Sequence, residues 1–91
     1  DAITEVLTVE RWLKKVSYKS YLIGKEQRIV FRDNQASLIN DNGVEIVTKF
    51  QYLDFEPQVV VYNKKGFSSI DTIKGAYGER DLNIDVSFAD F

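Results

Sequence analysis

The first 23 residues carry the longest helical pattern in the chain, and this pattern limits the possible folds more than any other feature. At 100° per residue, seven apolar residues of the segment fall within one face about 120° wide. They are Ala2, Val6, Val9, Trp12, Leu13, Val16 and Ile23. Gly24 follows at the position where many helices end. The sequence therefore predicts one long amphipathic helix over residues 1–23, with one face packed against the rest of the chain.

A second apolar line lies beside the packed face over the first two turns. Ile3 and Leu7 lie on this line, which becomes polar at Glu10. A helix that is apolar on more than one side has more apolar surface than a single sheet can cover. We therefore expect an assembly face at this end of the helix, formed by Ile3, Val6, Leu7 and Glu10.

After Gly24 the apolar period changes from that of a helix to that of a strand. Strands are predicted over Arg28–Arg32, Gln35–Asn40, Val44–Phe50, Gln58–Tyr62, Phe67–Ile73 and Leu82–Phe88, with Tyr52–Phe55 as a further short apolar run. No helical pattern separates the strands, so the sheet should be antiparallel. The predicted fold class is α+β, a long N-terminal helix packed on a small antiparallel sheet. Residues 1–24, the helix, and residues 25–91, the sheet, should form one domain.

Turn residues separate the predicted strands. Asp33-Asn34 and the run Asn40–Gly43 are typical of hairpin turns. Pro57 lacks a backbone donor, so it is expected at the start of a strand or at a sheet edge. Gln58–Tyr62 is apolar on both faces, which favours a central strand.

Residues 74–81, with glycines at positions 75 and 78, are predicted to form an exposed loop. Exposed loops with charged and aromatic side chains commonly contact partners. The expected loop contacts are Lys74, Tyr77, Glu79 and Arg80.

The chain contains neither His nor Cys. Their absence removes the commonest general base, the thiol nucleophile and the soft metal ligands. The nearby carboxylates Asp54 and Glu56 fit a solvated strand edge better than an acid–base pair, and no calcium-loop or phosphate-loop spacing is present. We therefore predict no catalytic residues, no metal site, no cofactor and no small-molecule substrate, with a carboxylate enzyme as the minor alternative.

Basic side chains are interleaved with tyrosines along the helix and just beyond it. They are Arg11, Lys14, Lys15, Lys19 and Lys25, with Tyr18 and Tyr21 between them. Such a pattern can bind nucleic acid, but the net charge is −2 and the C-terminal stretch contains Asp81, Asp85 and Asp90. We interpret the basic stretch as a solvated helix face and expect no direct nucleic-acid binding.

Two segments carry a resemblance to a known family. The helix residues 10–20 run through a short polar step into YLIGKEQRIVF at residues 21–31, and VVVYNKKGFSSI at residues 59–70 forms a strand, a polar turn and a Ser-rich strand start. This order resembles the globular part of type IV minor pilins and pseudopilins of the GspH/FimT type, and the related competence pseudopilins of the ComGD type. The resemblance covers most of the chain.

The resemblance implies a non-enzymatic subunit of a type IV pilus, a type II secretion pseudopilus or a competence DNA-uptake pilus. Its partners would be other pilin or pseudopilin subunits, and its location the cell envelope, on the extracytoplasmic face of the cytoplasmic membrane or in a surface filament. Arg11, Lys14 and Lys15 follow Glu5 too soon for a membrane-spanning run, so we expect the apolar membrane helix of the family to lie upstream of Asp1.

The alternative is a free soluble protein-binding module, either a cystatin-like inhibitor or a recognition domain. The stretch Gln58–Tyr62 is similar to the Q-x-V-x-G inhibitory hairpin of the cystatins, with Tyr62 in place of the glycine.

Overall fold

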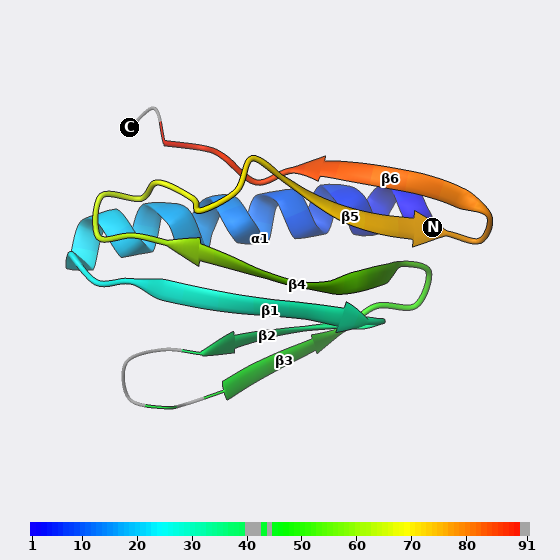
Figure 1. Ribbon diagram of the computed structural model, residues 1–91, viewed down its shortest axis with the longest axis horizontal. Helices are drawn as coiled ribbons and strands as arrows, with labels where there is room; N and C mark the ends of the chain where they lie inside the picture. Colours follow the sequence, from blue (N-terminus) through cyan, green and yellow to red (C-terminus); the bar gives the residue numbers. More distant parts are fainter. Residues whose placement is uncertain (40–42, 44, 90–91) are drawn as a thin grey trace.

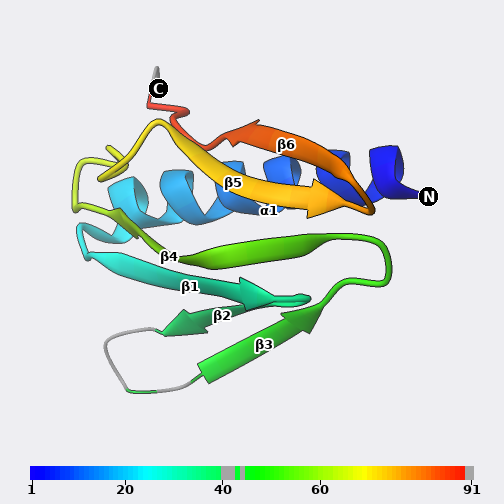
Figure 2. The ribbon, with the colours of Figure 1, turned by 45° about the vertical axis from the view of Figure 1, so that its right-hand side comes forward.

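The computed structural model describes residues 1–39, 43 and 45–89, and it consists of one helix packed on one sheet (Figure 1). The elements are α1 (Ala2–Ile23), β1 (Gln27–Asp33), β2 (Gln35–Ile39), β3 (Glu45–Lys49), β4 (Asp54–Tyr62), β5 (Thr72–Tyr77) and β6 (Arg80–Asp85). The strands form a six-stranded antiparallel sheet in the order β3-β2-β1-β4-β5-β6. Helix α1 packs against β1, β4 and β6 on one face of this sheet (Figure 2). The predicted α+β fold is therefore confirmed.

Local interactions define both ends of α1. The Asp1 carboxylate accepts a hydrogen bond from the Thr4 N–H at 2.9 Å, which satisfies one of the free donors of the first turn. Gly24 adopts the left-handed conformation with φ 63°, and its N–H bonds to the Ser20 carbonyl oxygen. The helix therefore ends where the sequence predicted.

The buried face of α1 changes character along its length. Val9, Leu13 and Val16 are buried as predicted, but the last turns bury Ser17 and Ser20 instead of Ile23. The Ser17 hydroxyl donates to the Gly66 carbonyl oxygen at 2.8 Å, so the helix lies against the backbone of the turn after β4. A bulky side chain at position 17 would separate these two backbones. Ile23 is 47% exposed, so the prediction that it belongs to the packed face is wrong.

Strands β1 and β4 form the centre of the sheet. Ile29 and Phe31 of β1 and Val60 and Tyr62 of β4 are buried beneath the helix. Trp12 of α1 is half-buried and packs edge-on against the Phe31 ring, with centroids 6.5 Å apart. The predicted central position of residues 58–62 is confirmed.

The predicted exposed loop over residues 74–81 is wrong. Residues 74–77 belong to β5 and residues 80 and 81 to β6, and only Gly78 and Glu79 form the turn between them. Gly75 pairs with Phe55 of β4, and a Cβ at Gly75 would lie 3.0 Å from the Asp54 carbonyl oxygen and 3.1 Å from the Phe55 ring. This glycine therefore permits a close approach of two strands instead of marking a flexible loop.

Further strand boundaries differ from the prediction, and β4 begins at Asp54 instead of Gln58. Residues 67–71 are irregular apart from one bridge between Tyr62 and Ser68, so the predicted strand over Phe67–Ile73 is wrong before Thr72. Strand β6 ends at Asp85 instead of Phe88, although Ile84 and Val86 are both buried.

Pro57 lies inside β4 instead of at its start. The pairing of β1 with β4 passes from Phe31↔Gln58 to Asp33↔Phe55, so two β4 residues lie opposite Arg32 alone. Such a bulge leaves a residue without a ladder partner, which is where a strand tolerates proline.

The predicted hairpin turn over residues 40–43, and Val44 at the predicted start of the third strand, lie outside the described residues, except for Gly43 with φ 73°.

Candidate assembly surface

The N-terminal turns of α1 present apolar side chains that the sheet leaves uncovered. Ile3 is 73% exposed and Leu7 47% exposed, while Val9, only two residues further on, is buried. Val6 and Glu10 are half-buried, and Val6 packs against the core. The predicted assembly face therefore lies at the border between the packed stripe and solvent.

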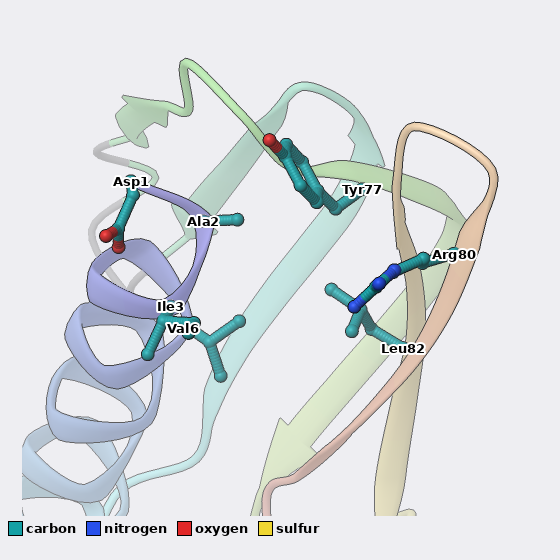
Figure 3. A pocket seen from close by; sticks show the side chains of 7 residues that line it. All are labelled: Asp1, Ala2, Ile3, Val6, Tyr77, Arg80 and Leu82. Carbon is teal, nitrogen blue, oxygen red and sulfur yellow. The ribbon is translucent and has the colours of Figure 1, made fainter.

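A pocket opens between this end of the helix and the β5–β6 hairpin. It has a volume of about 250 Å³ and is lined by Asp1, Ala2, Ile3, Val6, Tyr77, Arg80 and Leu82. Figure 3 shows Val6 on the helix side and Arg80 and Leu82 on the hairpin side, with their side chains extending toward the space between the two elements. The structure thus joins half of the predicted assembly face to half of the predicted loop contacts.

The other predicted site residues do not line this pocket. Leu7 and Glu10 lie further along the helix, and the lining does not include them. Lys74 lies near the middle of β5, where its backbone N–H and carbonyl oxygen both bond to the side chain of Gln58. Glu79 is exposed in the hairpin turn. We define the N-terminal surface as five of the pocket residues together with the exposed Leu7, which lies on the same helix line as Ile3. Its members are Ile3, Val6, Leu7, Tyr77, Arg80 and Leu82.

A carboxylate clamp holds the loop before β4 beside the same helix end. The Glu5 carboxylate accepts backbone hydrogen bonds from Gln51 at 2.6 Å, Tyr52 at 2.7 Å and Leu53 at 3.2 Å. Hydrogen bonds to a charged acceptor are stronger than those between neutral groups. This clamp ties the first turns of α1 to a loop that follows β3, nearly fifty residues later in the chain.

Two aromatic rings connect the clamped loop to the pocket. Tyr52, whose N–H binds Glu5, packs edge-on against Tyr77 of β5, with ring centroids 6.3 Å apart. Tyr52 is 37% exposed and Tyr77 is 45% exposed. Large aromatic side chains that are held in place but half exposed are typical of protein–protein contact sites.

The lining of the pocket is mainly apolar and aromatic, with Asp1 and Arg80 as its charged members. Among the described residues, no group of three or more acidic side chains is placed to hold a metal ion. The basic helix side chains Arg11, Lys14 and Lys15 line a shallow hollow with Tyr18, separate from the N-terminal surface. Within residues 1–39, 43 and 45–89, no helix has the length and apolar character needed to cross a bilayer.

Comparison with known proteins adds no further information about the site, because no family model, no curated protein and no solved structure matched the chain.

Sequence reasoning missed three residues at this end of the molecule: Glu5, Tyr52 and Leu82. Glu5 is an ordinary first-turn acidic residue by sequence, and its partners lie 46 to 48 positions away. Leu82 was predicted only as the start of a strand, but its half-buried side chain also lines the pocket. The apolar line of Ile3 and Leu7 was the local signal on the helix side of the surface, and Tyr77 and Arg80 were predicted contacts on the hairpin side.

Proposed function

We propose that this chain is the globular part of a minor pilin or pseudopilin, a structural subunit of a type IV pilus, a type II secretion pseudopilus or a competence pilus. In this proposal it is a membrane-anchored subunit of the cell envelope, and its partners are other subunits of the same filament. It performs no catalysis and binds no cofactor.

One observation supports this proposal more than any other. The helix buries one stripe against the sheet and leaves Ile3 and Leu7 exposed on a neighbouring line, next to a pocket between helix and hairpin. The exposed parts of Ile3 and Leu7 gain no hydrophobic stabilisation from their own domain, so burying them against another subunit would be favourable. A neighbouring subunit that packs against the N-terminal surface would bury them.

The cystatin-like alternative gains no support from the position of its motif. Residues 58–62 lie within β4, and the Gln58 side chain bonds to the backbone of Lys74. The motif is therefore held inside the sheet instead of being presented at a hairpin tip, and we propose no second function.

A double substitution on the exposed line tests the proposal. We expect Ile3→Ser with Leu7→Ser to change the free energy of unfolding of the soluble domain by no more than about 0.5 kcal/mol per site, because both side chains are exposed. The same pair in the full-length protein should greatly reduce its recovery in the sheared filament fraction, measured by immunoblot in the organism that encodes it. Leu13→Ala in the buried stripe should instead cost about 2–5 kcal/mol.

Leu22→Ser provides the matched control. Leu22 is 61% exposed on the same helix but lies at its other end, so the substitution should affect neither stability nor filament recovery. If Ile3→Ser/Leu7→Ser destabilises the domain as much as Leu13→Ala does, those side chains belong to the core and the proposal fails.

The gene provides an independent test. The reading frame should encode an apolar run of about 20 residues immediately upstream of Asp1. A cleavable secretory signal peptide or a native start at that point would overturn the pilin proposal.

A further inference from the structure

Strand β3 lies at one end of the sheet order and pairs with β2 on one side only, within the described residues. Figure 1 shows it at the edge of the sheet farthest from α1, while the helix lies over the opposite part. The outward backbone N–H and C=O groups of such a strand can pair with another strand. The structure therefore contains an accessible pairing edge away from the N-terminal surface.

The two faces of β3 both carry exposed apolar side chains. Ile46 is 52% exposed and Val47 is 47% exposed, and successive residues of a strand point to opposite faces. At the other end of the sheet, β6 places Ile84 in the core and leaves Leu82 only half-buried against it. Of the two outer strands, β3 is thus the one whose apolar side chains lack cover.

The charges on β3 are placed symmetrically about its centre. Glu45 and Lys49 lie two residues before and two residues after Val47, on the same face of the strand as Val47. Both side chains are exposed, and neither forms an ion pair with another residue in the part of the chain that the structure describes.

This arrangement is complementary to itself. If a second copy pairs antiparallel with Val47 on the two-fold axis, Glu45 of each copy lies opposite Lys49 of the other, and Ile46 lies opposite Thr48. Opposite charges directly across a strand pair stabilise it, and like charges destabilise it. Parallel pairing in register would place Glu45 opposite Glu45, so the charges favour the antiparallel arrangement.

We propose that β3 is a self-association edge, at which two copies of this chain pair antiparallel about Val47 and join their sheets into one. Pairing between strands places Val47 in a row with Ser37, Val30 and Val59 on the sheet face away from α1, and this row would continue into the second copy. A five-residue strand buries less surface than a standard stable interface, so the association is reversible and concentration-dependent. The proposal does not depend on the pilin function.

Sedimentation velocity with charge reversals tests the pairing. The chain described here should form a dimer as its concentration rises from about 10 µM to about 1 mM. Glu45→Lys alone and Lys49→Glu alone should each weaken the dimer about tenfold, because the two-fold axis turns two attractive pairs into two repulsive ones. The double variant Glu45→Lys/Lys49→Glu should recover the original affinity. A monomer over the whole range, or a double variant as weak as the singles, overturns the proposal.

Cysteine cross-linking gives a second readout that does not depend on charge. The chain has no Cys, so Val47→Cys introduces a single thiol on the proposed axis. Residues directly opposite in an antiparallel pair lie about 4.5–5.5 Å apart, which a disulfide can span. Mild oxidation should therefore give a covalent dimer.

Val59→Cys is the matched control for the cross-link. Val59 is 43% exposed on the same sheet face but lies on the interior strand β4, so it should cross-link far more slowly than Val47→Cys. Equal rates for the two variants would show random collision, and no dimer from Val47→Cys would show another register or another partner. Either result overturns the proposal.

Discussion

At the scale of single residues, the Glu5 side chain connects the start of α1 to the loop before β4. Its carboxylate is occupied by the backbone N–H groups of residues 51–53. These donors would otherwise need water or a strand partner, because the loop between β3 and β4 has left the sheet. Glu5 therefore acts as an internal anchor, with both carboxylate oxygens bonded within the chain.

We expect Glu5→Gln to lower the free energy of unfolding by about 1–3 kcal/mol. The amide replaces one acceptor oxygen with a donor that faces other donors, so at least one loop N–H loses its partner. Urea unfolding followed by far-UV circular dichroism measures the change.

Glu10→Gln is the control, because Glu10 is half-buried on the same helix and its side chain forms no hydrogen bond to the described residues. Equal losses in the two variants would show that the charge on the helix matters and the clamp does not.

At the scale of elements, β4 and β5 show how a side chain can replace part of a strand ladder. The two strands pair directly at Asp54↔Ala76 and Phe55↔Gly75. Beyond the bulge at Pro57, the side-chain amide of Gln58 forms the hydrogen bonds to β5. Its Oε1 accepts from the Lys74 N–H at 2.8 Å, and its Nε2 donates to the Lys74 carbonyl oxygen at 2.6 Å. One side chain thus bridges the strands where their backbones separate.

Gln58→Leu should destabilise the chain by about 1–2 kcal/mol, because both bonds to Lys74 are lost. The Lys74 amide should also exchange with solvent at least about tenfold faster, as measured by NMR hydrogen exchange. Gln51→Leu is the control, since Gln51 is exposed in the loop before β4. Unchanged exchange at Lys74 would show that the bridge does not hold β5.

At the scale of the whole molecule, one core joins segments from both ends of the chain. Val9 and Leu13 of α1 are buried in the same cluster as Val60 of β4 and Val86 after β6. The Tyr62 hydroxyl of β4 donates a hydrogen bond to the Val86 carbonyl oxygen at 2.6 Å, which connects the C-terminal segment to the central strands. Helix, sheet and C-terminal segment should therefore unfold together.

The pH dependence of unfolding tests this connection. Burial, with a smaller effect from the negative charge of Asp85, raises the pKa of Tyr62 above the ordinary value of 10.0. Above that pH the unfolded chain loses the phenol proton while the folded chain keeps it. The unfolded state then binds fewer protons, so stability falls as the pH rises beyond about 10, and the contribution of Tyr62 is fully present below that value.

Urea unfolding between about pH 8 and pH 11 should show this fall for the unmodified chain. Tyr62→Phe should remove the contribution of Tyr62 to the slope of the free energy of unfolding against pH. It should also lower the free energy of unfolding by about 1 kcal/mol at neutral pH, because the Val86 carbonyl oxygen loses its donor. Tyr77→Phe is the control substitution, since the Tyr77 ring is 45% exposed and lies outside the buried core. An identical slope in Tyr62→Phe would contradict the role of the buried phenol.

The sequence by itself determined the features that depend on near neighbours. The bounds of α1 follow from a helical period, the Asp1 cap and Gly24, which all act within about one turn. The inward residues of β1 and β6, such as Ile29 and Ile84, follow from simple alternation. Ile3 and Leu7 of the N-terminal surface could be predicted for the same reason, because they depart from the helical stripe locally.

Only the tertiary structure decided the features that depend on distant partners. Gly75 belongs to a strand, although glycine is typical of loops. Phe55 of the neighbouring strand occupies the space that a side chain at position 75 would need. Glu5 is a clamp only because residues 51–53 reach it, and the pocket exists only because the β5–β6 hairpin folds back beside the start of α1. A hydrophobic pattern reports which way a residue faces, whereas contacts between distant segments depend on how the strands are ordered and packed.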